Sequence, residues 1–593
     1  EIGSGLVGSE MCIRDRHDMI LADITLKGFR NYKDAHIKLE KNTLIIGAND
    51  VGKTNLIWAM RLLLDRSLSD YDIEPRSSDF YVLEETNSFV ILLHFTDITE
   101  ECVLSKLRGK ISDANEMYMS YNASRDPNTG KISYTIKAGA SVELLSDIEA
   151  HYYRKYLNIK YISCRRDLYA FISKERNFLF QNAKESRSTQ EEEEDNTLLQ
   201  EIKTKLQEAN NLIPTLHYIS KATNSINSEL KEMSIYNNNQ DVYFDTNSSN
   251  IDKFIDSTSV SSKTNDTPVN IGGDGRLNQI YLSLWATKHE IERPKLEEVS
   301  IVCIEEPEAH LHPHQQQKLA TYLSNKICGQ IFLTSHSPQI TSEFSPNSIV
   351  RLYKTEQSDT KAASNGCSKI IEGSIINFGY RMSIIPAEAF YADQVWLVEG
   401  ISEVIFYKAL SKFCGVDLLK NNISILMANG IGFSTFIKIL NAMNIPWKLR
   451  TDNDIFKIPK KKYYRMAGMQ RAISILEDYR ELDASEKKII EENKEKLKEL
   501  PTNIPTNEIN TICSTLRSIL NNHGIFLSEK DLENDMFNSP IKNDLIEFFN
   551  DLEEYEIITA MQEAKGNFMY NFIRQKSTSL SKLKEHSLTN LLR

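Results

Sequence analysis

Residues 395–406 read VWLVEGISEVIF, and they place two acidic side chains at the end of an apolar run. Residues 395–398 predict a buried strand that ends at Glu399. Gly400 predicts a turn, and Glu403 then falls in the first turn of a following helix. A single acid there is explained by the positive end of the helix dipole. Two acids four residues apart instead suggest half of a metal site, provided that further acids follow.

Further acids follow the next predicted strand. Residues 447–450 predict this strand, and Asp452 and Asp454 leave its end. A spacing of two places both side chains on one side of an extended segment. The succession of strand, helix, strand and helix from residue 395 predicts a parallel sheet, whose strands present their carboxyl ends at one edge. We therefore expect Glu399 and Asp452 to meet at that edge.

A third acidic pair comes from FLSEKDLENDMF, in which Glu533 and Asp535 are again two residues apart. Carboxylates without Cys or His among them suit Mg²⁺ or Mn²⁺ rather than Zn²⁺. Two such ions about 4 Å apart can activate a water and stabilise the leaving oxygen in phosphodiester cleavage. The predicted metal ligands are Glu399, Glu403, Asp452, Asp454, Glu533 and Asp535.

In the first part of the chain, NTLIIGANDVGKTNLIWAMRLLL predicts a short apolar strand, a loop and an amphipathic helix. Gly47, Gly52, Lys53 and Thr54 fit the pattern G-x-x-x-x-G-K-[ST] without a mismatch. Backbone N–H groups of such a loop surround phosphates, the lysine reaches the outer phosphates, and the Thr hydroxyl faces Mg²⁺. The predicted ATP contacts in this loop are Asn49, Gly52, Lys53, Thr54 and Asn55.

Three later stretches complete an ATP site. VSIVCIEEPEAHLHP predicts a buried strand ending in Glu305 and Glu306, where one acid holds Mg²⁺ and a second activates the attacking water. Upstream of it, IGGDGR is a glycine-rich stretch that runs into a helix. Downstream, IFLTSHSP predicts a strand ending at His336. This order predicts an α/β fold with an ABC-type ATPase head, the class that includes recombination and chromosome-maintenance ATPases.

Two positions depart from the usual pattern of such heads. Gly272 stands where a serine is usual, and Glu305 stands where an aspartate is usual. We therefore expect slow ATP turnover, with nucleotide acting mainly as a conformational signal.

The composition changes between the two ATPase halves. An acidic run at residues 191–195 is followed by helical spacing of Leu198, Ile202 and Leu206, and then by a stretch rich in Asn, Ser, Thr and Asp. We expect a helical insert that takes part in self-association, because its apolar residues have no obvious core of their own. The predicted domains are the ATPase halves at 19–180 and 266–375, the helical or dimerisation insert at 181–265, and a second α/β domain at 376–593.

The 593 residues are 41% hydrophobic and 26% charged, as expected for a globular protein of several domains. The net charge of −12 argues against a surface covered with basic residues, but it is compatible with a local basic groove. The eight cysteines form no C-x-x-C pair, which predicts a reducing, cytoplasmic location. No apolar run approaches the roughly 20 residues that cross a bilayer. Residues 1–18 resemble a translated linker, and we expect the native protein to begin at Met19; the alternative is that they form a disordered native tail.

A basic run, KIPKKKYYR at residues 457–465, directly follows the second acidic pair. Such runs are usually solvated loops. Beside a nuclease site this one would contact DNA phosphates, with Tyr463 and Tyr464 available to stack on bases.

The motif E-G-x-x-E followed by D-x-D resembles the Toprim pattern of topoisomerases, primases and certain nucleases. An ATPase head joined to a Toprim domain resembles the OLD (overcoming lysogenisation defect) nucleases, and within them the nuclease subunits of Gabija anti-phage systems. The stretches that carry the resemblance include ITLKGFRNY, GANDVGKTN, IEEPE, TSHSPQ, LVEGISE, TDND and LSEKDLENDM.

This resemblance covers nearly the whole chain from Met19. It implies cleavage of double-stranded DNA, with the six acids named above as catalytic metal ligands. It also implies that Lys565 stabilises the pentacovalent phosphate, as a point charge can. A homotetramer and a UvrD-like helicase partner are further implied.

Two other classes of function compete with this one. An ATP-driven DNA-repair, recombination or chromosome-maintenance protein would use the Toprim domain only as an accessory. A non-enzymatic, nucleotide-switched scaffold would have no use for six acids in Toprim order.

Overall fold

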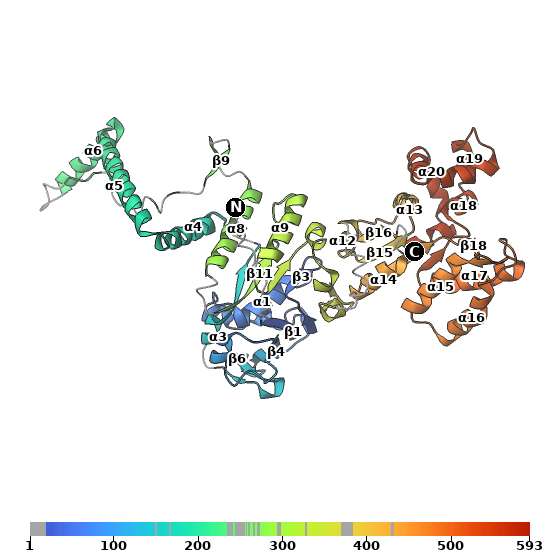
Figure 1. The fold of residues 1–593 in the computed structure, drawn as a ribbon, viewed down its shortest axis with the longest axis horizontal. Coiled ribbons are helices and arrows are strands. Elements are labelled where there is room, and N and C mark those ends of the chain that lie inside the picture. The colour runs from blue at the N-terminus through green and yellow to red at the C-terminus, as the bar shows by residue number, and fades with distance from the viewer. Residues whose placement is uncertain are drawn as a thin grey trace, which may run out of the picture. The chain divides into compact units, whose positions relative to one another are not determined.

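The computed structural model describes residues 19–148, 151–164, 168–233, 241–243, 255, 258, 261–264, 267–269, 273–292, 298–326, 329–368, 384–428 and 432–593 (Figure 1). The terminal segment 1–18 and Gly272 lie outside these residues. The chain divides into two compact units: residues 1–161, 298–308 and 312–593 form one, and residues 162–297 and 309–311 form the other. Among the described residues, no helix is long and apolar enough to span a membrane.

The first unit begins with an antiparallel sheet of six strands in the order β2-β1-β4-β5-β6-β7. Buried and exposed residues alternate along β4, so one face of this sheet is covered and the other faces outward. The strands are β1 (Ile20–Phe29), β2 (Tyr32–Lys38), β4 (Ser88–Thr96), β5 (Met117–Arg125), β6 (Ile132–Gly139) and β7 (Ser146–Asp147).

A second six-stranded sheet has the order β14-β13-β3-β12-β11-β8. Strands β13, β3, β12 and β11 run parallel, and β11 and β12 are apolar runs that are almost wholly buried, as expected when both faces of a sheet are covered. Helix α1 (Lys53–Leu64) lies beside β1 and β3 in Figure 1, and its apolar residues join both sheets in one core. The strands are β3 (Asn42–Ile46), β8 (Leu157–Ile162), β11 (Val299–Glu305), β12 (Ile331–Thr334), β13 (Ile349–Lys354) and β14 (Thr360–Ala362).

The second unit carries the predicted helical insertion. Ser188 and Glu191 form a capping box that starts α5. None of the residues of α5 and α6 is buried. The helices of this unit are α4 (Leu168–Glu185), α5 (Thr189–Leu212), α6 (His217–Met233) and α8 (Asp274–Glu292).

The second α/β domain is built on a four-stranded sheet of order β16-β15-β17-β20, in which every pair is parallel. The predicted parallel sheet is therefore confirmed. Its strands are β15 (Gln394–Val398), β16 (Ile423–Met427), β17 (Trp447–Thr451) and β20 (Ile525–Leu527). Helices α13 (Ile401–Phe413), α14 (Phe433–Ala442), α15 (Ala467–Tyr479), α18 (Leu532–Phe537) and α20 (Glu554–Lys576) surround it.

The remaining elements are short connections and outer helices. They are α2 (Asp70–Ile73), α3 (Glu101–Lys106), β9 (Ser262–Thr264), β10 (Thr267–Val269), α9 (Pro313–Lys326), α10 (Pro338–Thr341), α12 (Ile384–Ala389), β18 (Ile455–Lys457), β19 (Tyr464–Met466), α16 (Ala484–Lys494), α17 (Asn507–Asn522) and α19 (Lys542–Phe548).

Within the first unit, one buried arginine joins the six-stranded sheet that contains β13 to the four-stranded sheet that contains β15 and β17. Arg351 on β13 donates hydrogen bonds to the carbonyls of Phe390 and Ala392, at 3.0 Å each, and of Met443 and Asn444, at 3.1 and 3.3 Å. Because these carbonyls lie just before β15 and β17, the guanidinium ties the starts of both strands to the ATPase sheet.

Candidate functional site

The carboxyl edge of the four-stranded sheet gathers acidic side chains from several elements. Glu399 directly follows β15, and Glu403 lies in the first turn of α13, where its Oε2 accepts from the Gly400 N–H at 3.2 Å. Asp452 directly follows β17, which pairs in parallel with both β15 and β20. The expectation that Glu399 and Asp452 meet at one edge is confirmed, because Oε1 of Glu399 accepts from the Asp452 N–H at 3.0 Å.

A single oxygen of Glu399 has several donors. Its Oε1 accepts from Oγ1 of Thr451 at 2.5 Å and from Nη2 of Arg471 at 2.6 Å, in addition to the Asp452 N–H. The same Arg471 nitrogen is 3.9 Å from Asp454. Arg471, on α15, is therefore the cation that contacts this side of the acidic edge.

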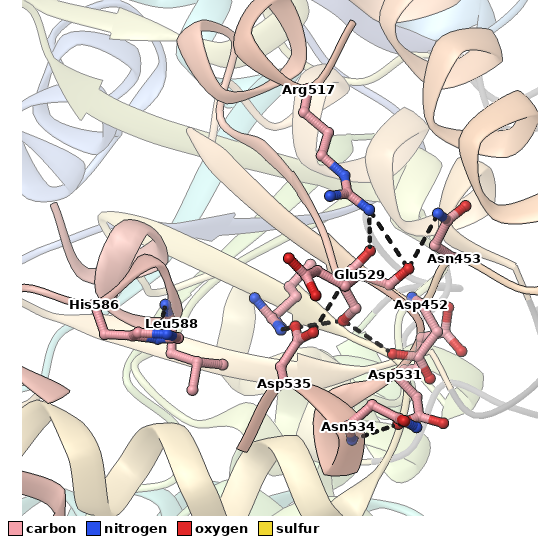
Figure 2. A network of polar contacts seen from close by, with 12 residues as sticks. Asp452, Asn453, Arg517, Glu529, Asp531, Asn534, Asp535, His586 and Leu588 are labelled. Carbon is pink, nitrogen blue, oxygen red and sulfur yellow. Dashed lines mark hydrogen bonds and ion pairs between the residues drawn. The ribbon is translucent and has the colours of Figure 1, made fainter. Parts of the chain in front are cut away.

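A second chain of contacts holds Asp452 from the other side. Oγ of Ser528 donates to Oδ1 of Asp452 at 3.2 Å, and Nη2 of the buried Arg450 donates to that Ser528 hydroxyl at 3.0 Å. Arg517 fixes the loop that follows β20 by donating to the carbonyls of Ser528 and Glu529 (Figure 2). Asp452 is thus oriented by Ser528, which lies 76 residues away in the sequence and is itself held by Arg450.

Helix α18 separates the two acids of the third predicted pair. A helix turns by about 100° per residue, so side chains two residues apart point to opposite sides. Glu533 is buried near other carboxylates, whereas Asp535 makes an ion pair with Arg450 and accepts from the Glu529 N–H at 3.0 Å (Figure 2). This pair was predicted from its spacing of two alone, and the segment is helical. The ligand role of Asp535 remains a prediction, and its observed partners fit a supporting role.

Asp531 was not identified from the sequence. It is the N-cap of α18: its Oδ1 accepts from the Asn534 N–H at 2.8 Å, and its Oδ2 accepts from Nε2 of Gln562 at 2.7 Å. The negative charge of Asp531 also raises the pKa values of three neighbouring acids, Asp452, Asp454 and Glu533. Its position as an acidic N-cap before an acidic first turn was the available sequence signal. We call Glu399, Glu403, Asp452, Asp454, Asp531 and Glu533 the acidic cluster.

Lys565 is placed against this cluster by a break in helix α20. Its backbone has φ 32° and ψ −111°, outside the helical region, and such positive φ is unfavourable for a lysine. The next residue, Gly566, packs against α13, since a Cβ there would lie 2.8 Å from Cγ2 of Ile401. The charge of Lys565 lowers the pKa of Asp454 and Glu533, partly offsetting the effect of their burial. The structure therefore brings Lys565 together with the predicted acids.

The acidic cluster carries more negative charge than its protein partners neutralise. Burial, with a contribution from neighbouring acids, raises the pKa of Asp452 to about 8 and that of Glu533 to about 7. The pKa values of Glu403 and Asp454 are also raised, for the same two reasons. A cation among these oxygens would favour the ionised carboxylates.

The oxygen-only donor set of the cluster fits Mg²⁺ or Mn²⁺. Within the described residues, however, no three acidic, His or Cys side chains converge closely enough to form a ready-made metal cage. The chemistry of the donors therefore suits a hard divalent cation, while Glu399 and Asp535 are engaged by arginines.

The phosphate loop is folded around its own lysine. Nζ of Lys53 donates to the carbonyls of Gly47 and Ala48 at 2.9 Å each, and burial lowers the pKa of Lys53. Gly52, with φ 108°, precedes α1, and a Cβ there would lie 2.1 Å from Nδ2 of Asn31. The positive φ favours glycine at this position.

The other predicted residues of the loop surround this lysine. Nδ2 of Asn55 donates to Oδ1 of Asn31 at 2.6 Å, and Nη1 of Arg30 donates to Oδ1 of Asn55 at 2.8 Å. Asn49 and Thr54 are exposed. Asn49 and Thr54 are thus accessible at the positions where the motif predicts phosphate and Mg²⁺ contacts. Arg30 and Asn31, which contact Asn55, are not part of the motif.

The predicted acids and histidine of the ATP site also come together. The negative charges of three acids, Glu305, Glu306 and Glu308, raise the pKa of Lys53 and partly offset the effect of its burial. Nε2 of His336 is 3.5 Å from Oε1 of Glu306, and burial, with the charge of Lys53, lowers the pKa of His336.

Two further partners at this ATP site were missed in the sequence. Tyr161 on β8 donates its hydroxyl to Oε2 of Glu305 at 2.7 Å. Glu308 accepts from Oγ of Ser335 at 2.7 Å and from the His336 N–H at 2.8 Å. Glu308 therefore holds the segment after β12 in place.

Comparison with known proteins identifies both halves of this arrangement. Residues 19–341 match the model of an AAA ATPase domain. Residues 390–454 match the "Overcoming lysogenization defect protein-like, TOPRIM domain".

Similar whole proteins carry the same combination. Endonuclease GajA of Bacillus cereus is 25% identical over 582 residues, covering 94% of this chain and 96% of that protein. An OLD nuclease of Thermus scotoductus is 22% identical over 460 residues, covering 74% of this chain and 83% of that protein. Among solved structures, an SMC head bound to a domain of ScpA covers 57% of this chain and 96% of that chain, with 17% identity and a TM-score of 0.33.

The contrast between the two acids of α18 gives a stability prediction. Asp535→Asn leaves the buried Arg450 without its counter-charge, which we expect to cost about 3–5 kcal/mol. Glu533→Gln removes one charge from a crowded cluster and should raise the apparent Tm of the metal-free protein. Thermal unfolding in the presence of a chelator measures both changes, with the exposed Glu356→Gln as a control. A change of the apparent Tm in the same direction for Asp535→Asn and Glu533→Gln would contradict the different environments assigned to these two acids.

Proposed function

The chain belongs to the OLD family of nucleases, which join an AAA ATPase domain to a TOPRIM domain, and on that premise we propose that it is a divalent-metal-dependent DNA endonuclease regulated by nucleotide. The observation that supports this proposal most directly is the acidic cluster at the carboxyl edge of the parallel sheet. Its buried carboxylates have raised pKa values, which favours a role as cation ligands.

The roles of the site residues follow from their chemistry. Glu399, Glu403, Asp452, Asp454, Asp531 and Glu533 would hold the cations, with Asp535 orienting Arg450 or entering the ligand set. Bound Mg²⁺ or Mn²⁺ would supply a water of lowered pKa and stabilise the leaving oxygen. Lys565 would place its charge on the phosphate as negative charge accumulates there. Ser528 and Arg450 would keep Asp452 in its ligating orientation.

A basic hairpin next to the site is suited to the DNA backbone. Strands β18 and β19 enclose Lys460, Lys461 and Lys462, and Tyr463 is 45% exposed. We assign phosphate contacts to these lysines and base stacking to Tyr463. Lys461 also pairs with Glu499 at 2.5 Å, so its contribution to DNA binding requires exchange of that partner.

Nucleotide would act as a signal that passes through the first unit. The Tyr391 hydroxyl is 2.7 Å from Oγ1 of Thr341 and donates to the Ser337 carbonyl at 3.3 Å, in the segment that follows His336. Tyr391 lies shortly before β15, the strand that ends at Glu399. A ligand shifts the equilibrium between two conformations of a protein only if it binds them with unequal affinity. The contacts of Tyr391 would carry such a shift from the segment after His336 toward the strand that ends at Glu399.

The biological setting follows from the resemblance to Gabija nuclease subunits and is proposed on that basis. The protein would be the nicking or cleaving subunit of an anti-phage complex, with double-stranded DNA as substrate and a UvrD-like helicase subunit as partner. Cys303, Cys367, Cys414 and Cys513 are free thiols, which fits a reducing cytoplasm. A fall in cellular ATP would release cleavage.

The metal site is tested by removing one acid from each strand end. Glu399→Ala and Asp452→Ala should each reduce Mg²⁺- or Mn²⁺-dependent cleavage of supercoiled DNA by at least about 100-fold, which is about 2.7 kcal/mol in the barrier. The exposed Glu356→Ala serves as the control. Parental cleavage by Glu399→Ala would reject the metal-site assignment and favour an ATPase with an accessory TOPRIM domain.

The regulatory role is tested by titrating ATP at fixed free Mg²⁺, because chelation by nucleotide would imitate inhibition. We expect ATP to inhibit cleavage by the parent protein. Lys53→Ala should weaken this inhibition and retain nucleotide-free cleavage, while the exposed Lys27→Ala should behave like the parent. Loss of nucleotide-free cleavage in Lys53→Ala, or an unchanged ATP response, would count against the switch.

We also propose a homo-oligomer, a tetramer by resemblance, to which the insert contributes. Tyr218, Ile226, Leu230 and Met233 form an apolar stripe on α6, and all four are exposed. The double variant Ile226→Asp with Leu230→Asp should lower the mass measured by light scattering at micromolar concentration. Ser228→Asp, on the other side of α6, should leave it unchanged. A monomeric parent protein would contradict the proposal.

A further inference from the structure

Arg471 reaches the acidic cluster because helix α15 presses against the D-x-D segment. A Cβ on Gly468 would lie 2.1 Å from the Asp452 carbonyl oxygen, so this position has room only for glycine. The Gly468 N–H also donates to the Asp454 carbonyl at 3.3 Å. The close approach fixes the first turn of α15, and Arg471 follows one turn later.

The contacts of Arg471 are those of a cation rather than of a well-satisfied guanidinium. One nitrogen, Nη2, lies 2.6 Å from Oε1 of Glu399, 2.6 Å from Oγ1 of Thr451 and 3.1 Å from the Asp452 carbonyl. This nitrogen has only two hydrogens for three oxygens. The side chain is therefore held mainly by negative charge, at the expense of the geometry that a guanidinium prefers.

This position conflicts with binding of a divalent cation by the same carboxylate oxygen. Oε1 of Glu399 already accepts from Thr451, the Asp452 N–H and Arg471. A second cation at this oxygen would meet the guanidinium at short range, where like charges repel strongly. Arg471 is partly exposed, at 37% of its side chain, so it has a path away from the cluster.

We propose that Arg471 is an internal counter-cation that occupies Glu399 in the metal-free protein and must be displaced before a divalent cation binds there. This inference rests on the proposed metal-dependent function and adds a determinant of its metal requirement. Arg471 thereby raises the concentration of Mg²⁺ or Mn²⁺ at which the site fills. It also accounts for the lack of a ready-made cage among the described acidic side chains, since Glu399 is engaged by the arginine.

The first test measures Mn²⁺ binding to the full chain by calorimetry, with electron paramagnetic resonance of free Mn²⁺ as a second readout. Arg471→Met should lower the Kd for Mn²⁺ about tenfold, and Arg471→Lys should fall between this variant and the parent. Arg465→Met, which removes an exposed charge on β19, should change the Kd less than about twofold. An unchanged or weaker affinity in Arg471→Met overturns the inference.

A second measurement uses the parent protein and does not depend on how the variants fold. Phenylglyoxal modifies accessible arginines, and mass spectrometry reports each site separately. Labelling of Arg471 should rise several-fold when Mn²⁺ saturates the protein, while labelling of Arg465 stays constant. Labelling of Arg471 that is insensitive to Mn²⁺ overturns the inference.

Glu399→Ala separates failure of this inference from failure of the proposed function. If Glu399→Ala weakens Mn²⁺ binding but Arg471→Met leaves it unchanged, the metal site stands and the counter-cation role fails. If Glu399→Ala binds Mn²⁺ as the parent does, the metal-site assignment itself fails, and the inference fails with it.

Discussion

Repulsion among buried carboxylates at one edge of a parallel sheet is the constraint on which the second domain depends. Parallel strands end at the same edge, so acids placed just after β15 and β17 are forced together by the topology. Burial then raises the pKa of Asp452 and Glu533, because water no longer stabilises their charges. Such repulsion is relieved by protonation, as the raised pKa values indicate, or by cations, and this chain supplies Arg471 and Arg450 at the two sides of the cluster.

The two arginines have different environments, which suggests different roles. Arg450 is buried with Asp535 and reaches Asp452 through the Ser528 hydroxyl, so it belongs to the permanent framework. Arg471 is partly exposed, with 37% of its side chain accessible, whereas 6% of the Arg450 side chain is accessible. The framework arginine fixes the orientation of a ligand, while the exposed arginine is replaceable by a metal ion. Together, Arg450 and Arg471 would allow the domain to fold without metal while its acidic cluster stays available to bind a metal ion.

The strands of the second α/β domain and their parallel arrangement could be predicted, because they depend on local patterns. The apolar runs before Glu399 and Asp452 indicated buried strands, and their alternation with helices indicated a parallel sheet. The P-loop was identified for a similar reason, since Gly47, Gly52, Lys53 and Thr54 stand at fixed spacing.

The errors and omissions arose where the long-range fold decides the contact. Glu533 and Asp535 were paired on their spacing of two alone, and the helical conformation of α18, which turns them to opposite sides, was not predicted. Asp531 offered only the local signal of an acidic N-cap. Arg471 and Tyr161 carry no local motif, and the acids that they contact, Glu399 and Glu305, lie 72 and 144 residues away in the sequence. The environment of Lys565 depends on a helix break that nothing in its flanking sequence predicted.

The central claim is that the acidic cluster binds the catalytic cations. Anomalous X-ray scattering from crystals of the protein grown with Mn²⁺ tests it most directly, because the signal locates the metal without any assumption about activity. The account predicts two Mn²⁺ peaks about 4 Å apart among Glu399, Asp452 and Glu533. Ordered Mn²⁺ elsewhere in the protein, with this edge of the sheet empty and Arg471 still paired with Glu399, would contradict it.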